Sequence, residues 1–309
     1  MSLKKLGVLD FGYRHDINPS SERVHSVIKE AVLLEKLGFS KIWYAEHFTD
    51  SLQYIWASPD MLIPIIAAHT ESINVGIAGT CIKYNNPLKI AKDYHLLAET
   101  FGKRIDLGFS KGMQDGYYGS ILNLTIKAIE PQNIREELQA RIKLTIDLIA
   151  SQHGILKPDV WNLVGSSSGY ETSFSLGANC SRTLFHLRSN IQPDNFKQQQ
   201  YVEGFYNKFG KTPKSNICVA GTIQKDSKLI EEIKQKHLHL IDTDTCFCGS
   251  PSEVSDLLHA CAEKYQVEEI IFFEMSFREI DRKNSFKSLG KIISKLPPVI
   301  EAIAMEESF

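Results

Sequence analysis

The sequence lacks both a long hydrophobic run and a strong excess of charge of either sign. No stretch of about 18 consecutive apolar residues occurs, so we expect no membrane-spanning helix. The formal net charge is -2, which leaves no basic surface to hold nucleic acid or an anionic membrane. The first apolar run, in residues 4–12, is too short for a secretory signal. These features predict a cytoplasmic protein.

Cysteines are few and scattered. The six of them lie mostly in apolar stretches, which is typical of reduced, packed thiols in a cytosolic protein rather than of a disulfide framework. Cys246 and Cys248, in the segment CFC, are too close together for the usual zinc-ligand spacing. We therefore expect no metal site and a structural role for this pair.

A low-complexity linker is also absent, and strand-like and helix-like periodicities alternate along the whole chain. Apolar runs and turn residues delimit the expected strands, and capping residues and glycines delimit the expected helices. The expected strands are 5–12, 41–46, 73–82, 104–110, 159–165, 182–187, 215–223 and 267–274. The expected helices are 20–39, 58–70, 86–102, 133–151, 168–177, 194–209, 225–236, 250–265 and 285–303.

Eight strands that alternate with helices indicate parallel pairing through right-handed crossovers. Such a sheet either stays open and doubly wound or closes into a barrel. The number of strands, and the absence of a Gly-x-Gly-x-x-Gly segment after the first strand, favour closure. We therefore predict an α/β fold, a (β/α)8 TIM barrel, in a single domain over residues 1–309.

The segment KIWYAEHF, residues 41–48, ends a mostly apolar strand with a carboxylate and an imidazole. In a barrel of this kind the carboxyl ends of the strands form the active face, so Glu46 and His47 are expected there. Strand alternation predicts that Trp43 and Ala45 point to one side of the barrel wall.

Four segments carry a family resemblance, and they occur in the expected order along the chain. They are LGFSKIWYAEHF, SINVGIAGTCIKYNNPLKIAKDYHLLAETFGKRIDLGFSKG, DVWNLVGSSSGYETSFSLG and FCGSPSEVSDLLHACAEKYQVEEIIFFE. Together they resemble the signature regions of the luciferase-like, flavin-dependent monooxygenases, and the match is weakest at 110–155 and 185–245. The resemblance implies a bacterial-luciferase-like barrel, commonly dimeric, that binds reduced FMN, or in some branches the deazaflavin F420, at its carboxyl face.

By this resemblance His47 is the counterpart of the family's catalytic histidine. A histidine titrates near neutral pH and can move a proton in the reaction. Many relatives have two consecutive histidines here, whereas this chain has Phe48 in the second place, so its proton handling is expected to differ. Glu46 is interpreted as the group that orients the imidazole. The alternative is a strand-end histidine that Glu46 and the backbone satisfy.

The segment GIAGT, residues 76–80, contains two glycines, which weaken a strand and mark a bulge or a close backbone approach. The resemblance implies a bulge with a non-prolyl cis peptide beneath the flavin ring. The aligned bond joins Ala78 to Gly79, next to Thr80, and tight packing in the barrel wall is the alternative.

Relatives often have an arginine near the position of Lys111, and that arginine meets the cofactor phosphate. The resemblance therefore implies a phosphate contact for Lys111, and the alternative is a solvated lysine.

The serine-rich segment GSSSG, residues 165–169, follows the fifth strand and opens a helix. Backbone N–H groups at a helix start, together with hydroxyls, can hold a phosphate, and the resemblance implies this use. The predicted cofactor contacts are Gly165, Ser166, Ser167 and Ser168. Two alternatives are that Ser168 only caps the helix, and that phosphate binds near Ser250, after the last strands, as in many barrels.

Three further residues are candidates for substrate contact. Asp10 and Phe11 end the first strand, and His186 ends the sixth, so all three are expected at the active face. Asp10 can instead satisfy only local amides, and His186 can instead belong to the core or the rim.

The resulting prediction is a flavin-dependent oxidoreductase that uses reduced FMN and O2 on an unidentified small organic substrate. The chain shows no second nucleotide-binding domain, so a separate flavin reductase is expected to supply the electrons. A homodimer is also expected. The alternatives are an F420-dependent hydride-transfer enzyme and a non-catalytic flavin-binding protein on the same scaffold.

Overall fold

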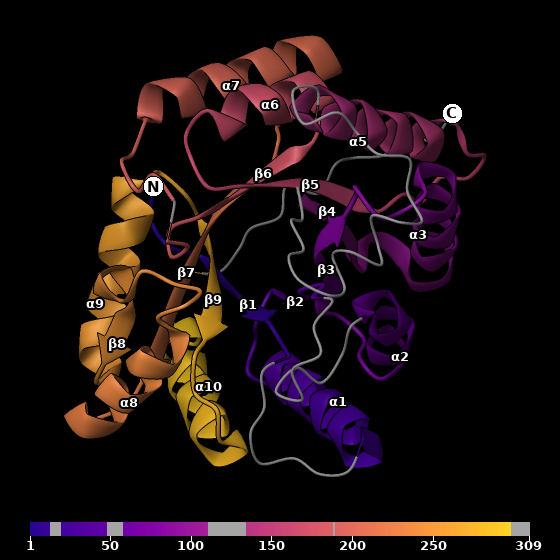
Figure 1. Cartoon of the computed structure of the whole chain (residues 1–309). Coiled ribbons are helices and arrows are strands. Elements are labelled where there is room, and N and C mark those ends of the chain that lie inside the picture. The colour runs from indigo at the N-terminus through magenta and orange to yellow at the C-terminus, as the bar shows by residue number, and fades with distance from the viewer. Residues whose placement is uncertain (13–19, 48–57, 111–133, 188, 298–309) are drawn as a thin grey trace.

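A computed structural model of the chain describes residues 1–12, 20–47, 58–110, 134–187 and 189–297. Parallel strands form the centre of the molecule and helices surround them (Figure 1). The strands are β1 (Lys5–Asp10), β2 (Lys41–Tyr44), β3 (Asn74–Cys81), β4 (Ile105–Ser110), β5 (Asp159–Val164), β6 (Asn179–Thr183), β7 (Ser215–Ile223), β8 (Phe247–Gly249) and β9 (Glu269–Glu274). The helices are α1 (Ser20–Lys36), α2 (Leu62–Ala68), α3 (Pro87–Phe101), α5 (Ile134–Ser151), α6 (Gly169–Leu176), α7 (Asn195–Phe209), α8 (Ser227–His237), α9 (Pro251–Lys264) and α10 (Glu279–Ile293).

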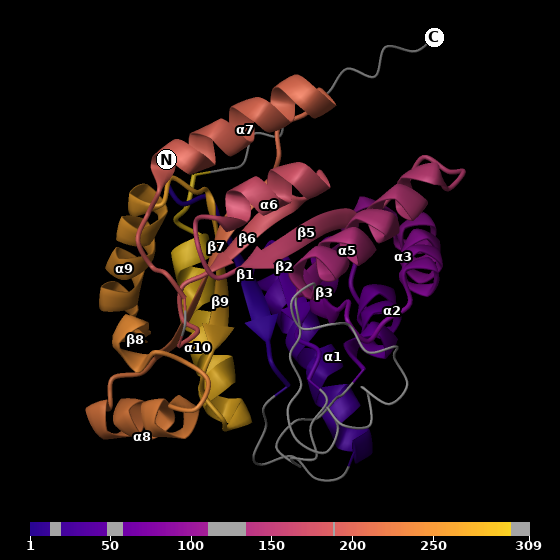
Figure 2. The same ribbon diagram turned by 45° about the horizontal axis from the view of Figure 1, so that its top comes forward.

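The strands close into a barrel, as predicted. Each strand from β1 to β6 pairs with the next in parallel, β9 pairs with both β1 and β7, and β6 pairs with β7 to complete the ring. The short strand β8 pairs with the carboxyl-terminal part of β7, beyond the last partner in β6. The predicted (β/α)8 barrel is therefore confirmed, with β8 as an addition that the sequence did not indicate. Figure 2 shows α7 outside α6, on which it packs.

The sixth strand lies earlier than predicted. We expected it at residues 182–187, because those residues are more apolar, but β6 spans Asn179–Thr183. Its register is set by its neighbours, since Asn179 pairs with Trp161 of β5 and Cys180 with Ser215 of β7. After β6, Leu184 and Phe185 are buried without being part of a ladder, whereas Leu187 is exposed.

The last described helix also begins earlier than predicted. We expected a helix over 285–303, whereas α10 spans Glu279–Ile293, and residues 298–303 lie outside the described residues. Ser285 is an internal helix residue whose hydroxyl donates to the Glu274 carboxylate and accepts from the backbone N–H of Ile223 at 3.1 Å. The first turn of α10 was missed because it is polar. Its Arg282 is nevertheless buried, since it binds Glu30 of α1.

Ser250 does cap its helix, which bears on where a phosphate can bind. Its hydroxyl accepts from the Glu253 N–H at 3.4 Å, and the Glu253 carboxylate accepts from the Ser250 N–H at 2.8 Å. This reciprocal capping box uses the groups that a phosphate would need. The structure therefore gives Ser250 a structural role.

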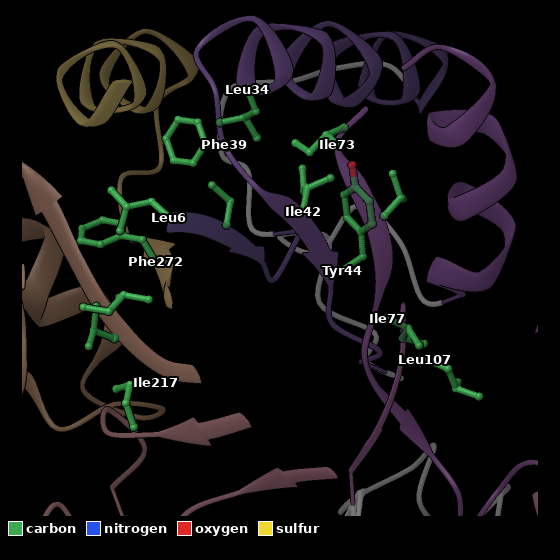
Figure 3. Packing of buried hydrophobic residues seen from close by; sticks show 14 of the residues in the cluster. Leu6, Leu34, Phe39, Ile42, Tyr44, Ile73, Ile77, Leu107, Ile217 and Phe272 are labelled. Carbon is green, nitrogen blue, oxygen red and sulfur yellow. The ribbon is translucent and has the colours of Figure 1, made fainter. Parts of the chain in front are cut away.

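The two faces of each strand serve different cores. Ile42 and Tyr44 pack outward, in the layer between the strands and the surrounding helices, together with Leu34 of α1 and Phe272 of β9 (Figure 3). Trp43 belongs to a second buried cluster inside the barrel. The predicted alternation along β2 is therefore confirmed. Among the described helices, none is long and apolar enough to cross a membrane.

A buried carboxylate ties the strands together inside the barrel. Asp106 on β4 is fully buried and accepts hydrogen bonds from the indole N–H groups of Trp43, at 2.8 Å, and Trp161, at 3.2 Å. The Lys41 ammonium lies 3.4 Å from Asp106 and 3.3 Å from Glu269. Burial alone would lower the pKa of Lys41, but the two carboxylates raise it. Lys41 is therefore charged, and its charge is compensated.

We expect Asp106→Ala to lower the free energy of unfolding by about 3–5 kcal/mol, because it removes one counter-charge of a buried ammonium and the acceptor of two buried indoles. Urea denaturation checks this. Lys214→Ala is the control, since it breaks an ion pair with Asp159 in which the lysine side chain is 60% exposed, and it should cost less than about 1 kcal/mol. Equal midpoints for the two variants would show that the Asp106 contacts do not stabilise the barrel.

Candidate functional site

A cavity of about 420 Å³ lies at the carboxyl ends of the barrel strands. Its volume lies in the range that small-molecule and cofactor sites occupy. The strand-end position is where TIM barrels carry their active sites. The predicted site residues that line it are Phe11, Glu46, His47, Ala78, Gly79, Gly165, Ser166, Ser168 and His186.

His47 lies deep in the cavity wall, directly after β2. Its ring stacks on Phe11 with a centroid distance of 4.9 Å and an angle of 18°. Burial, and then the nearby His186, lower the pKa of His47 to about 4, although a hydrogen bond with the Phe11 backbone acts in the opposite direction. The imidazole is therefore neutral at physiological pH, unlike an ordinary histidine, which is partly charged there.

Glu46 also lines the cavity, but its contacts differ from those predicted. Its carboxylate accepts hydrogen bonds from the Cys81 N–H at 2.6 Å and from Asn85 Nδ2 at 3.4 Å. Burial raises its pKa to about 7, and the Asp60 carboxylate adds to the rise. These contacts direct Glu46 toward the end of β3 rather than toward the imidazole of His47. Glu46, not His47, is the cavity group that titrates near neutral pH.

The bulge in β3 is present. The pairing with β4 shifts between Ile77 and Thr80, and the peptide bond between Ala78 and Gly79 is cis. A Cβ on Gly79 would lie 2.9 Å from the backbone of Phe109 and of Ser110, so tight packing in the wall requires this glycine. Ala78 and Gly79 also line the cavity, so the tightly packed bulge forms part of its wall.

The serine-rich turn borders the cavity at the start of α6. Ser166 and Ser168 share a hydrogen bond of 2.8 Å between their hydroxyls, and Ser168 makes no side-chain cap. The first two N–H groups, of Gly169 and Tyr170, already donate to carbonyls within the turn. A phosphate here would therefore bind the two hydroxyls in the field of the helix N-terminus, rather than these two N–H groups.

Four predicted contacts do not line the cavity or cannot be placed. Asp10 accepts from the Gly12 N–H at 2.8 Å and lies 3.6 Å from Arg282, which agrees with its alternative role as a local structural acceptor. Thr80 is fully buried and Ser167 is partly exposed, but neither lines the cavity. Lys111 lies outside the described residues.

Several cavity residues were not predicted. Arg135, at the start of α5, is the one cationic side chain among the described lining residues. Trp43 also reaches the cavity, so the residue that Asp106 holds in place forms part of its wall. Arg135 lies within 110–155, one of the two regions where the family resemblance is weakest, and no sequence signal marked this arginine. Other polar lining residues are Ser110, Asn162, Thr172, Ser181, Thr183 and Ser189.

These features define a parallel eight-stranded α/β barrel whose cavity, at the carboxyl ends of the strands, combines an apolar interior with a serine-rich turn. The family model described as luciferase-like monooxygenase matches residues 5–118. Over these residues the chain is similar to this family.

Curated relatives are similar to part of the chain. An N-acetyl-S-alkylcysteine monooxygenase from Bacillus subtilis is 27% identical over 107 residues, which cover 35% of this chain and 32% of the relative. The match thus spans about a third of the length of that curated relative.

Solved structures share the fold along most of the chain. The oxygenating component of 3,6-diketocamphane monooxygenase from Pseudomonas putida, in complex with FMN, has a TM-score of 0.67 at 14% identity, covering 97% of this chain and 100% of that chain. An F420-dependent secondary alcohol dehydrogenase has a TM-score of 0.69 at 14% identity, covering 94% and 99%. At these identities the likeness establishes the fold alone.

The raised pKa of Glu46 makes a prediction about stability. The native state holds this proton up to about pH 7, whereas the unfolded chain releases it near pH 4.5. Unfolding therefore releases a proton between these values, and the contribution of Glu46 to stability falls as the pH rises from 4.5 to 7. We expect Glu46→Gln to remove this loss, a relative stabilisation of about 2–3 kcal/mol at pH 8 compared with pH 4.5.

Urea denaturation at several pH values measures this difference. Glu263→Gln, at an exposed helix position, is the matched control and should shift stability equally at all pH values. A Glu46→Gln variant whose stability runs parallel to that of the original protein would show that the carboxyl is not protonated in the native state.

Proposed function

We propose that the chain is a monooxygenase that uses reduced FMN and O2 on a small organic substrate, with a separate reductase as its electron source. One observation carries this proposal: a single cavity joins the serine-rich turn to His47, Glu46 and the β3 bulge. The similarity of residues 5–118 to luciferase-like monooxygenases supports oxygenase chemistry, and bound reduced flavin would supply two electrons to activate O2. A homodimer in the cytoplasm is part of the same proposal.

The residues at the rim of the cavity suit a ribityl phosphate. Ser166 and Ser168 offer hydroxyl donors, α6 directs its N-terminus toward them, and Arg135 supplies a positive charge. A guanidinium can bind a phosphate through two parallel hydrogen bonds. Arg135 would take the role that we assigned to Lys111, or share it.

The residues deeper in the cavity suit a ring system. Leu9, Trp43 and Phe185 provide apolar and aromatic walls, and Ala78 and Gly79 expose backbone along one side. Apolar walls exclude water, which strengthens the electrostatic interactions of buried polar groups. We place the flavin ring against Ala78 and Gly79.

Two ionisable groups divide the proton chemistry. Neutral His47 can accept a hydrogen bond or a proton through its free electron pair but is not an acid at neutral pH. Glu46, with a pKa of about 7, can hold a proton and release it within the physiological range. Glu46 would therefore perform part of the proton transfer in this chain, which has Phe48 where many relatives have a second histidine.

A second candidate is F420-dependent hydride transfer, which the barrel shared with the F420-dependent alcohol dehydrogenase favours. The cavity groups would serve it as well, since F420 also carries a ribityl phosphate. A flavin-binding protein without turnover is the third outcome.

The phosphate site can be tested by binding alone. Under anaerobic conditions we expect Arg135→Ala, and separately Ser166→Ala with Ser168→Ala, to weaken reduced FMN about tenfold, corresponding to the loss of charge-assisted hydrogen bonds. Binding of riboflavin, which lacks the phosphate, should be unchanged. Ser167→Ala is the matched control, because its side chain does not line the cavity. Equal losses for FMN and riboflavin would rule out a phosphate role, and uptake of F420 alone would favour the second candidate.

Turnover can be tested with an added flavin reductase, NADH and a panel of small organic compounds under isotopically labelled O2. We expect labelled product, and a loss of at least about 100-fold in rate for His47→Asn, as for removal of a general base. The pH–rate profile should show an ionisation near pH 7 that Glu46→Gln lacks. Flavin uptake without product would indicate a binding protein.

A further inference from the structure

Two thiols lie together on the edge of the barrel, outside the cavity. Cys246 and Cys248 flank Phe247 in and next to β8, and both are free and partly exposed. Residues two apart in extended backbone point to the same side, so the two thiols lie on one side of this segment. The other cysteines, by contrast, are buried.

We propose that Cys246 and Cys248 form an oxidisable dithiol, which a hydroperoxide converts into a reversible disulfide. The proposal rests on the placement of the two thiols on one side of an extended segment, their partial exposure and the charges around them. It does not depend on the proposed monooxygenase activity.

Cys248 is the attacking sulfur. Interaction with the neighbouring Cys246 thiol is the largest cause of the lowered pKa of Cys248, ahead of burial, which acts in the opposite direction. A backbone hydrogen bond with Thr222 and the charge of Lys234 on α8 lower the pKa further, while Glu274 raises it. A larger thiolate fraction makes a cysteine a better nucleophile toward peroxides.

The reaction proceeds in two balanced steps. The Cys248 thiolate attacks one oxygen of the hydroperoxide, the O–O bond breaks, and the products are a sulfenic acid and, after protonation, water or an alcohol. The Cys246 sulfur then attacks the sulfenic sulfur, an S–S bond forms, and the leaving hydroxide takes the Cys246 proton to give water. The two thiols lose two electrons and two protons, which the hydroperoxide accepts.

The backbone makes this disulfide easy to reduce. Cys246 and Cys248 lie in extended backbone, where residues two apart have Cα atoms about 6.6–6.8 Å from each other. That spacing is at the upper limit for a disulfide. A bond formed there is strained, and strained disulfides are the labile, regulatory ones.

The dithiol is connected to the cavity wall through one loop residue. The Cys246 thiol lies 3.7 Å from the carbonyl oxygen of Asp242, to which it can donate. The N–H of Asp242 donates to the carbonyl of Phe185 at 2.7 Å, and Phe185 lines the cavity. Closing the disulfide removes the Cys246 donor from this chain of contacts, so oxidation reaches the wall of the site.

The test treats the whole protein with hydrogen peroxide, alkylates the remaining thiols after denaturation, and analyses peptides by mass spectrometry. Trypsin leaves Cys246, Cys248 and Cys261 in one peptide, 237–264, so a glutamate-specific protease is added to cut after Glu253. We expect the peptide with Cys246 and Cys248 to lose the mass of two hydrogens, to escape alkylation, and to regain both thiols with dithiothreitol.

Single variants identify the order of the steps. Cys246→Ser should leave a Cys248 sulfenic acid that dimedone traps, whereas Cys248→Ser should leave Cys246 unoxidised at the same dose. Cys261→Ser, the matched control, should behave like the original protein. Full alkylation of both thiols after peroxide treatment of folded protein would overturn the proposal, as would a disulfide that involves Cys261. The measurement on the original protein decides the question even if a variant fails to fold.

Discussion

The carboxylate of Asp106 holds the barrel interior in place, and the functional cavity depends on it. Both its oxygens accept indole N–H groups, one from β2 and one from β5, and the Lys41 ammonium lies beside it. The same ammonium lies 4.2 Å from the ring centroid of Trp161. A buried charge of either sign alone would be costly, and only this mutual arrangement compensates both. Because Trp43 is fixed from below by Asp106, it presents a defined aromatic wall to the cavity above.

Burial then sets the chemistry of that cavity. Burial favours the neutral form of every ionisable group, so it raises the pKa of Glu46 and lowers that of His47. His186, whose ring meets that of Phe11 edge-on at a centroid distance of 6.4 Å, lowers the pKa of His47 further. The motif of a glutamate followed by a histidine thus exchanges its expected roles: the carboxyl titrates near neutral pH and the imidazole does not.

The sequence predicted most elements well because strands buried on one or both faces leave a strong pattern. The range of β7 was predicted without error, and the bulge at Ala78 and Gly79 was anticipated from two glycines in a strand and a family resemblance. β6 was placed too late because its apolar continuation looked more strand-like than its polar start. Polarity misled there because the barrel buries Ser181, a polar residue that the prediction left out of the strand.

The sequence by itself determined the alternation of strands and helices, the barrel class, and the family motifs at the ends of β2, β3 and β5, since all of these are local patterns of polarity and of special backbone residues. Only the tertiary structure decided that His47 stacks on Phe11, that Glu46 binds the Cys81 amide, and that Arg135 borders the cavity. These contacts join residues far apart in the chain. Their protonation states follow from burial, which no local pattern of residues records.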